Sequence, residues 1–474
     1  MTTPTGHVAA LDFGASSGRV IVGEVGRDVL RMRQFARFAN RPVSAGGRLH
    51  WNVLALWQGA IDGLAAAGRE VPDLMSVATD TWGVDYGLLR AGRLLGNPAH
   101  YRDERTAAAL AAVHARIAPE SMYRRAGVEQ LPINTIYQLA ADGAEGLLDA
   151  ADGVLMMPDL FSYWLSGRRV AERTIASTTG LLSAASGQWD PELVAAAGVP
   201  PALLPEVVAP GTRLGPLLPE LADALGLAHS LEVVAVGAHD TASAVVAVPM
   251  PAAGAVYVSC GTWGLVGMER AAPTLTEEAR LAGFTNESGV DGRFLLMRNA
   301  MGLWLLSECV REWESGGERI DLPELLAAAS EVTAKQPTLA VDDPLFAAPG
   351  DMPARIAAWC EQRGVPAPSG RPETVRCIVE SLAVSFASAA RDTARVANAP
   401  LTQINIVGGG SLNELLCQRL ADHAGVPVFA GPVEATALGN VLLQARTMGL
   451  IDGSLDELRE LVRRTHIPVR YDPS

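Results

Sequence analysis

The sequence predicts an α/β protein built from two related domains. Three strand-like runs, HVAALDF, GRVIVGEV and VLRMRQFARF, follow one another from His7, and a segment with helical spacing of apolar residues (51–67) and a further strand-like run (75–79) come next. A similar order recurs in the second half of the chain. The length of 474 residues suits two or three domains of about 150 residues each, so each half is long enough to bury its own core.

The first half begins with an antiparallel meander, because its three strand-like runs are joined by short turns that contain glycine. The helix predicted over 51–67 then leads to the strand 75–79, which ends at Asp80. This order predicts a mixed α/β unit.

The second half repeats the pattern. AVYVSCGTWGLVGM predicts two strands around a turn at Gly261 and Thr262, and FLLMRN predicts a third. MGLWLLSECVREW and the segment 375–386 have helical spacing, and QINIVGGGSLNELLCQRL predicts a buried strand, a glycine turn and a helix. We place the domains at 1–245 and 246–474, with the last helices packing back on the first domain.

Composition limits the class of protein. The chain is 49% hydrophobic and 19% charged, as in globular proteins, and its net charge of −14 argues against a nucleic-acid or anionic membrane surface. The first residues, MTTPTGHVAALDFG, lack the basic segment followed by an apolar run that is typical of a signal peptide. The uncharged stretch 241–268 is long enough to span a bilayer, but its prolines and glycines favour a buried strand, a turn and a hairpin. The five cysteines form no close metal-ligand pair, which favours a reduced, cytoplasmic protein.

Lys335 is the only lysine, and no glycine-rich loop precedes it. P-loop enzymes and protein kinases need a lysine at a fixed place beside the phosphates, so both classes are excluded. Any nucleotide phosphate must therefore be held by backbone N–H groups, hydroxyls and arginine.

The first motif, LDFGASSGR (11–19), lies at the predicted turn between the first two strands. Its glycines allow a ligand close to the backbone, its hydroxyls and Arg19 can donate to phosphate, and Asp12 can hold a metal ion through water. The letters Gly14-x-Ser16-x-Gly18 also match the nucleophile elbow of serine hydrolases, which requires a helix next. Residues 19–22 have strand character instead, so we disfavour the hydrolase.

The second motif, VVAVGAHDTAS (233–243), is a buried strand that runs into a polar group. Asp240 at a strand end can accept a proton from a substrate hydroxyl, as phosphoryl transfer requires. An equally strong alternative is that Asp240 only caps a helix. His239 alone is more often a structural hydrogen-bonding residue than a catalyst.

Two further glycine-rich turns follow predicted strands, SCGTWG (259–264) and VGGGS (407–411). The first offers a hydroxyl for a terminal phosphate, and the second offers a glycine surface at a helix start. Each is weak alone. Together with the first motif they predict a nucleotide held between two domains.

These motifs, with ATDTWGVDYGLL, AHYRDERT, INTIYQL, MMPDLFSYWLSG, RNAMGLWLL and GPVEATALGN in this order, resemble the FGGY carbohydrate kinases from about residue 11 to 440. TDTWGVD combined with AHDTASAV and NAMGLWLL is most similar to the L-rhamnulose kinases of that family. The resemblance implies two ribonuclease-H-like domains of the actin-like ATPase fold, with the active site in the cleft between them. It also implies transfer of phosphate from ATP to the C1 hydroxyl of L-rhamnulose, with L-fuculose, L-xylulose and D-xylulose as alternative substrates.

The resemblance also implies roles for matching positions. Asp240 would be the catalytic base, Thr262 would lie near the γ-phosphate and Gly409 at the adenine. The nucleotide set comprises Asp12, Gly14, Ala15, Ser16, Ser17, Gly18, Arg19, Gly261, Thr262, Ser307, Gly408, Gly409, Gly410 and Asn413. The sugar set comprises Asp80, Trp82, Gly83, Asp103, His239, Asp240, Thr241 and Asn299. Asp12 (through water) and Asp240 would hold Mg²⁺.

The chain departs from the family in places. Ser307 stands where a glutamine is frequent, so a polar contact to the nucleotide is shortened or taken over by water. YRDER keeps Asp103 but lacks the tryptophan of the wider family's WxDxR. Cys360 and Cys377 fall where related kinases can carry a pair, and the sequence leaves open whether they bond. A non-catalytic ATP-binding sensor is disfavoured because the base, Asp240, is present. Expected partners are a small sugar and ATP, with no nucleic acid or membrane, in a monomer or homodimer.

Overall fold

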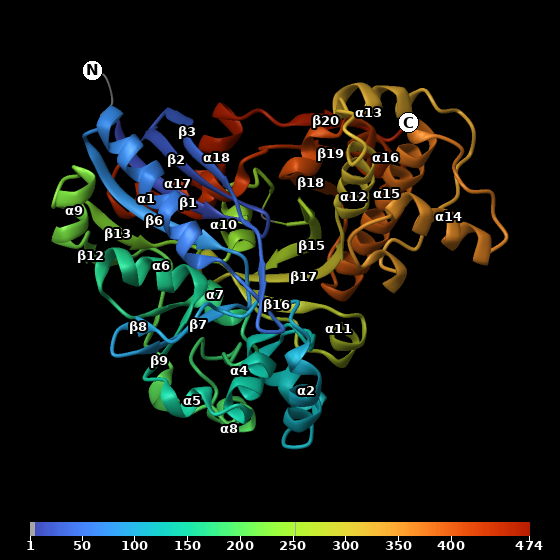
Figure 1. Cartoon of the computed structure of the whole chain (residues 1–474). Helices are drawn as coiled ribbons and strands as arrows, with labels where there is room; N and C mark the ends of the chain where they lie inside the picture. The colour runs from blue at the N-terminus through green and yellow to red at the C-terminus, as the bar shows by residue number, and fades with distance from the viewer. Residues whose placement is uncertain (1–4, 252) are drawn as a thin grey trace. The chain divides into compact units, whose positions relative to one another are not determined.

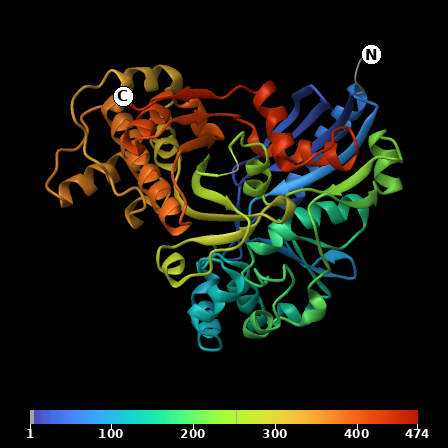
Figure 2. The same cartoon turned by 180° about the vertical axis from the view of Figure 1, so that it is seen from behind.

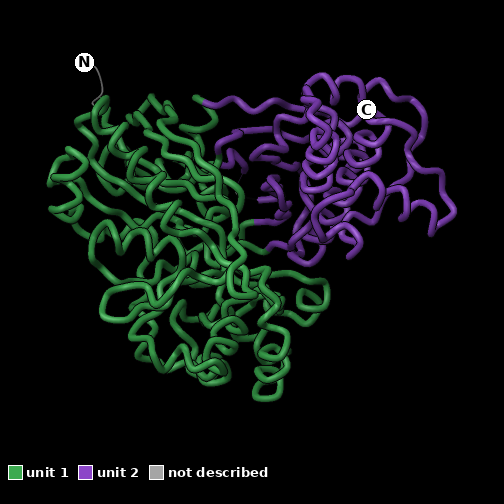
Figure 3. The backbone as a smooth tube through the Cα atoms, in the orientation of Figure 1, with its two compact units in different colours: residues 1–247, 269–296, 435–465 green, residues 248–268, 297–434, 466–474 purple. Residues whose placement is uncertain are grey.

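A computed structural model describes residues 5–251 and 253–474 of the chain. The backbone forms two compact units, each made of several chain segments (Figure 3). Unit 1 comprises residues 1–247, 269–296 and 435–465, and unit 2 comprises 248–268, 297–434 and 466–474. Two segments that follow residue 246 in the sequence therefore belong to unit 1.

Unit 1 holds the first three strands, the long helix α1 and two helices from near the end of the chain. Its strands are β1 (Gly6–Phe13), β2 (Ser17–Gly26), β3 (Val29–Ala39), β4 (Val43–Ala45), β5 (Arg48–His50), β6 (Leu74–Thr81), β7 (Tyr86–Arg90), β8 (Arg93–Leu94), β9 (Gly153–Met156), β10 (Ala171–Glu172), β11 (Val207–Val208), β12 (Thr212–Pro216), β13 (Glu232–Ala235) and β16 (Thr285–Ser288). Its α-helices are α1 (Val53–Glu70), α2 (Ala107–His114), α3 (Pro119–Ala126), α4 (Thr135–Ala144), α5 (Leu147–Ala150), α6 (Met157–Ser166), α7 (Arg173–Ser177), α8 (Pro191–Ala197), α9 (Pro219–Leu225), α10 (Asp240–Val246), α11 (Glu277–Leu281), α17 (Ala435–Thr447) and α18 (Leu455–Thr465).

The main sheet of unit 1 has the strand order β12-β13-β6-β1-β2-β3. The strands β1, β2 and β3 are antiparallel neighbours, which confirms the predicted meander, and β6 pairs with β1 in parallel. Both faces of β1 are covered, so seven of its eight residues are buried. Leu11 and Phe13 belong to a core that includes side chains of α1 and α6.

The helix α17 covers β1, β2 and β6 although it lies more than 350 residues later in the chain. Figures 1 and 2 show this helix and α18, in red, beside the blue strands of the same unit. α17 also packs on α10 so closely that a Cβ at Gly439 would lie 1.8 Å from the carbonyl oxygen of Ser243.

Unit 2 is centred on a sheet with the neighbour order β17-β15-β14-β18-β19-β20. β14 and β15 form the predicted hairpin, with Cys260 opposite Gly264. Its elements are β14 (Ala255–Cys260), β15 (Trp263–Arg270), β17 (Phe294–Met301), α12 (Trp304–Glu314), α13 (Leu322–Ser330), α14 (Met352–Gln362), α15 (Arg371–Val396), β18 (Gln403–Val407), α16 (Glu414–Ala424), β19 (Val428–Ala430) and β20 (Val469–Tyr471), with β15 and β17 ending and beginning, respectively, in unit 1.

One secondary-structure prediction is wrong. The uncharged stretch 241–268 does not begin with a buried strand, because residues 240–246 form α10. A short apolar run that is buried all round has no polar face to distinguish helix from strand. Among residues 5–251 and 253–474, no helix is both long and apolar enough to cross a membrane. Part of the segment inspected for a signal peptide (1–4) and one residue of the predicted boundary region (252) lie outside the described residues.

All five cysteines are buried and free, Cys360 and Cys377 included.

Candidate active site

The turn between β1 and β2 carries the first predicted phosphate-binding motif. It is closed by a hydrogen bond from the Gly14 N–H to the Ser17 carbonyl at 2.9 Å, and Asn40 braces it by donating to the carbonyls of Ser16 and Gly14, at 3.0 Å each. Ser16 is exposed. Because β2 is a strand, the turn lacks the strand–turn–helix geometry of a nucleophile elbow, and the hydrolase alternative is excluded.

Three predicted carboxylates of unit 1 gather near this turn. Asp12 lies opposite Asp80 in the β1–β6 pairing and forms an ion pair with Arg19 at 3.0 Å. Asp80 is fully buried and accepts a hydrogen bond from Asn440 Nδ2 at 2.6 Å. Burial, then the charges of Asp12 and Asp240, raise the pKa of Asp80 well above its usual range, against the bond from Asn440. The three acids are therefore within electrostatic reach of one another.

Asp240 is the first residue of α10, preceded by His239 at the N-cap position, so its side chain is not the cap. Its Oδ1 accepts from the N–H of Thr241 at 2.6 Å and lies 3.3 Å from His239 Nε2. Burial raises the pKa of Asp240, and the neighbouring His239 and Thr241 oppose that shift. The side chain remains 30% exposed, so it can be reached by a ligand.

His239 lies between two carboxylates. Its Nδ1 is 2.8 Å from Glu287 Oε2 on β16, and its Nε2 faces Asp240. Burial by itself lowers the pKa of His239, but Glu287, followed by Asp240 and Glu172, raises it to about 9. The imidazole is therefore protonated at neutral pH, and its charge favours the ionised form of Asp240.

The segment before Asp240 is fixed by a buried glutamate. Glu172 accepts from the backbone N–H groups of Thr174, Ile175 and Ala238, and Thr174 Oγ1 accepts from the N–H of His239 at 3.1 Å. Burial raises the pKa of Glu172 to about 7. This network links α7 to the segment between β13 and α10, directly before the candidate base.

The TDTWGVD loop after β6 brings Gly83 beside His239. A Cβ at Gly83 would lie 3.5 Å from His239 Nε2 and 3.3 Å from the Thr178 side chain. The loop is anchored by Asp85, which accepts from the indole N–H groups of Trp51 at 2.5 Å and Trp82 at 3.0 Å. Trp82 belongs to the predicted sugar set, but its indole N–H already donates a hydrogen bond to Asp85.

Asp103 sits in a separate ion network of unit 1. It accepts from the guanidinium of Arg48 at 3.1 Å and from the N–H groups of Leu49 at 2.9 Å and Arg105 at 3.2 Å. Burial tends to raise the pKa of Asp103, but these donors lower it below its usual value. Its contacts within the chain hold β5 to the following segment, and its predicted contact to sugar stays a prediction.

In unit 2 the predicted nucleotide residues are mainly turns. The Gly261 N–H donates to the carbonyl of Trp263 at 2.9 Å, and the carbonyl of Gly261 accepts from Leu303 at 2.8 Å. Gly408 and Gly410 both lie against Cys260. A Cβ at Gly408, whose φ is 79°, would lie 2.8 Å from the carbonyl oxygen of Cys260, and a Cβ at Gly410 would lie 2.4 Å from its Sγ. The hairpin and the glycine triplet are thus brought together, with Thr262 half-exposed and Gly409 exposed.

Asn413 caps α16 by accepting from the N–H of Leu416 at 3.0 Å. Its Nδ2 is buried and has no hydrogen-bond partner in the described parts of the chain, which leaves a donor for a ligand. Asn299 on β17 and Ser307 on α12 are exposed. Their roles as sugar and nucleotide contacts stay predictions.

The donor set of unit 1 suits Mg²⁺. Within residues 5–251 and 253–474 no three acids, histidines or cysteines cluster as a complete protein cage. Mg²⁺ is usually held by one or two carboxylates with water and substrate phosphates, so Asp12 and Asp240 are chemically adequate.

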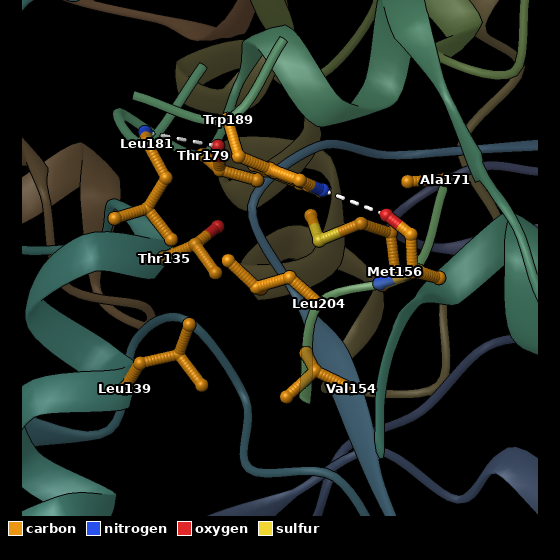
Figure 4. A pocket seen from close by; sticks show the side chains of 10 residues that line it. Thr135, Leu139, Val154, Met156, Ala171, Thr179, Leu181, Trp189 and Leu204 are labelled. Carbon is orange, nitrogen blue, oxygen red and sulfur yellow. Dashed lines mark hydrogen bonds between the residues drawn. The ribbon is translucent and has the colours of Figure 1, made fainter. Parts of the chain in front are cut away.

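A small pocket of unit 1 contains none of the predicted site residues (Figure 4). Its lining is mostly apolar, with Leu139, Met156 and Trp189 among the walls and the hydroxyls of Thr135 and Thr179 at its edge. The Trp189 N–H is used by the carbonyl of Pro205 at 2.7 Å. Thr135 Oγ1 donates to the carbonyl of Val84 at 2.6 Å, so one wall of the pocket contacts the loop that contains Gly83.

The sequence reasoning missed five residues that hold the site. Asp85 stands inside a quoted motif, but nothing marked it as the acceptor for two tryptophans. Gln138 and Asn440 also stand inside quoted motifs, and no role was given to either. Glu172 and Glu287 come from segments without a local signal.

Comparison with known proteins finds the same family that the sequence motifs resemble, along nearly the whole chain. Residues 7–247 match the N-terminal domain of the FGGY family of carbohydrate kinases, and residues 256–448 match its C-terminal domain. The chain is 39% identical over 468 residues to a rhamnulokinase of Bacteroides thetaiotaomicron, covering 98% of this chain and 95% of that protein. It is 38% identical over 474 residues to a rhamnulokinase of Pectobacterium carotovorum, covering 98% and 93%.

Solved structures share the fold. A xylulose kinase from Lactobacillus acidophilus aligns with a TM-score of 0.80 at 16% identity, covering 99% of this chain and 94% of that chain. A Plasmodium falciparum glycerol kinase with ADP aligns with a TM-score of 0.80 at 13% identity and the same coverage. At these identities the likeness concerns the fold alone, and it confirms the predicted two-domain α/β class.

Proposed function

The chain belongs to the FGGY family of carbohydrate kinases and is an ATP-dependent sugar kinase, and from this premise we propose that it phosphorylates L-rhamnulose at the C1 hydroxyl, forming L-rhamnulose 1-phosphate and ADP. The substrate is supported by relatives named rhamnulokinase at 37–39% identity over nearly the whole chain. The proposed chemistry is supported above all by one arrangement. Asp240 lies beside the charged imidazole of His239, and Gly83, which has no side chain, lies beside the same imidazole.

Asp240 is the proposed general base. The C1 hydroxyl oxygen forms a bond to the γ-phosphorus while the bond from that phosphorus to the β–γ bridging oxygen breaks, and the hydroxyl proton passes to Asp240. Burial raises the pKa of Asp240, the charge of His239 opposes that rise, and Thr241 fixes the carboxylate through two hydrogen bonds to Oδ1. Gly83 leaves room for the sugar beside His239.

The phosphates are proposed to lie on backbone and hydroxyl groups rather than on lysine. The turn residues Ala15 to Ser17 and the guanidinium of Arg19 supply donors in unit 1, and Thr262 supplies a hydroxyl in unit 2. Mg²⁺ that accompanies ATP would be held by Asp12 through water and by Asp240, and would neutralise charge on the phosphate oxygens. Gly408–Gly410 and Asn413 are proposed to line the nucleotide.

The test is ADP release in a coupled assay with Mg²⁺ and ATP, across L-rhamnulose, L-fuculose, L-xylulose, D-xylulose and glycerol. We expect a strong preference for L-rhamnulose. Asp240→Asn should fold and bind sugar but lose turnover by about 100-fold to 10,000-fold, since the base is gone. Preference for another ketose would assign the chain to a sister sugar kinase, and near-normal turnover by Asp240→Asn would refute the base.

A further inference from the structure

The loop beside His239 contains an unusual backbone conformation at Val84. The N–H of Asp85 donates to the carbonyl of Gly83 at 2.9 Å, which closes a three-residue turn, and the central residue Val84 has φ of 67°. A turn of this size with positive φ at its centre is the rare, strained form of the γ-turn.

Val84 is the wrong kind of residue for this conformation. Among the described residues the other non-glycine positions with positive φ are Ala91, Asp291, Asp351 and Asn398. None of these is β-branched. A β-branched side chain at positive φ is a true outlier, whereas asparagine and aspartate adopt it several-fold more readily.

The surrounding structure holds the strained turn in place. The Val84 N–H donates to Thr178 Oγ1 at 3.1 Å, and its carbonyl accepts from Thr135 Oγ1 at 2.6 Å and from Gln138 Nε2 at 3.3 Å. Gln138 Nε2 also donates to Asp85 Oδ1 at 2.9 Å. Strain of this sort persists only where several contacts impose it, and such sites cluster where ligands bind.

All three hydrogen bonds to Val84, from Thr135 and Gln138 and to Thr178, use its backbone. Glycine would make the same hydrogen bonds and would adopt the same φ without strain. These hydrogen bonds therefore do not explain why the residue is a valine, and we look for the explanation in its isopropyl group. That side chain is only half-buried, and it stands one residue after Gly83, which faces His239.

We propose that Val84 is a specificity-determining residue of the sugar site, whose isopropyl group packs against the C6 methyl group of a 6-deoxy ketose. This inference rests on the proposed function. L-rhamnulose differs from L-fructose only in carrying a methyl group where L-fructose carries a hydroxymethyl group. An isopropyl group offers no hydrogen bond to a C6 hydroxyl, so burying that hydroxyl against Val84 is unfavourable.

The test measures sugar binding without ATP, by calorimetry on the full chain. Dissociation constants are measured for L-rhamnulose and L-fructose with wild type, Val84→Thr and Val84→Gly. Threonine keeps the branched shape and exchanges one methyl for a hydroxyl, so the preference for L-rhamnulose should fall roughly tenfold. Val84→Gly should lose the preference as well, with no fall in Tm, because glycine relieves the strain. Val29→Thr, a half-buried valine of β3, is the matched control and should keep the wild-type preference.

Each outcome decides between the alternatives. Preference in Val84→Thr within twofold of wild type, or no preference in wild type, would overturn the role of Val84. If Val84→Gly lowered Tm and kept the preference, the isopropyl group would be structural packing only, which also overturns it. A wild-type chain that prefers L-rhamnulose in binding but transfers no phosphate would refute the proposed function and leave Val84 supported. Failure to bind either sugar would overturn both.

Discussion

The candidate residues of unit 1 and those of unit 2 are held in different ways. In unit 1 the important groups are acids and a histidine, and each is fixed by side chains from other segments: Glu287 for His239, Asn440 for Asp80. In unit 2 the important groups are glycine turns that lie against Cys260, and their partners are mostly backbone atoms.

This difference teaches where each region is sensitive to mutation. A charged group that is buried needs matched partners, since losing one leaves a charge or a polar atom unsatisfied. A tight turn needs only the absence of a side chain. We therefore expect unit 1 to respond to changes of charge and pH, and unit 2 to respond to changes of volume.

The largest effect is expected at His239. Its pKa is about 9 in the folded chain against an ordinary 6.5, so its contribution to stability is complete below pH 6.5 and is lost as the pH rises through about 9. The difference corresponds to about 3 kcal/mol. In Glu287→Gln most of this pH dependence should vanish, as measured by urea unfolding at pH 6.5 and 9.5.

The matched control for that experiment is Glu278→Gln, an exposed carboxylate of α11 in the same chain segment. It should keep the wild-type pH dependence. An unchanged pH dependence in Glu287→Gln would show that His239 does not depend on this carboxylate, and would break the contrast between the two units.

The next effect concerns volume in unit 2. In Gly410→Ala the new Cβ would meet Cys260 Sγ at 2.4 Å, so the turn must shift, and we expect a loss of about 2 kcal/mol in unfolding free energy and a raised KM for ATP. Gly409→Ala, whose Cβ has no neighbour nearer than 3.8 Å, should keep wild-type stability. Equal unfolding midpoints for the two variants would contradict the volume argument.

A smaller effect is expected from Asn440→Ala. The change removes the 2.6 Å hydrogen bond to Asp80 and one of the two acceptors of Gln444 Nε2, which should lower the unfolding free energy by about 1.5 kcal/mol. Denaturant unfolding measures it. A variant as stable as wild type would mean that Asp80 is satisfied by its own protonation.

The smallest effect should come from Arg48→Ala. Arg48 is 35% exposed, and Asp103 keeps two backbone donors without it, so the loss should stay below about 1 kcal/mol. A fall in Tm as large as that of Asn440→Ala would show that this ion network is as important as the buried one.

Local signals were enough to predict much of the fold and to single out the turns and acids of the candidate site. The strands β1 to β3 and β14 and the helices α1 and α15 follow from periodicity, and the turns at Gly261 and Gly408 follow from glycine after a strand. Asp240 could be singled out because a buried strand, β13, ends shortly before it, at Ala235, and a short polar group follows. The segment 240–246 was misjudged because apolar burial alone does not distinguish helix from strand.

The supporting residues could not be found in this way. Glu287 looks like an ordinary polar residue in its own segment, and Gln138, although inside a quoted motif, shows nothing of its role there. The importance of both arises only when folding brings them to His239 and Val84. Backbone strain is equally invisible in the sequence, because a valine after a glycine gives no sign that its φ is positive.

The position of α17 has a consequence for how the chain reaches its native state. Asp80, Ser76 and Ala9 are synthesised 360, 368 and 435 residues, respectively, before their hydrogen-bond partners on α17, which are Asn440 for Asp80 and Gln444 for the other two. One face of the main sheet of unit 1 therefore stays uncovered until α17 has been synthesised. The N-terminal segment cannot mature as an independent folding unit, and a ribosome that stalls before residue 447 releases a chain with an exposed apolar sheet, the sort of intermediate that chaperones bind.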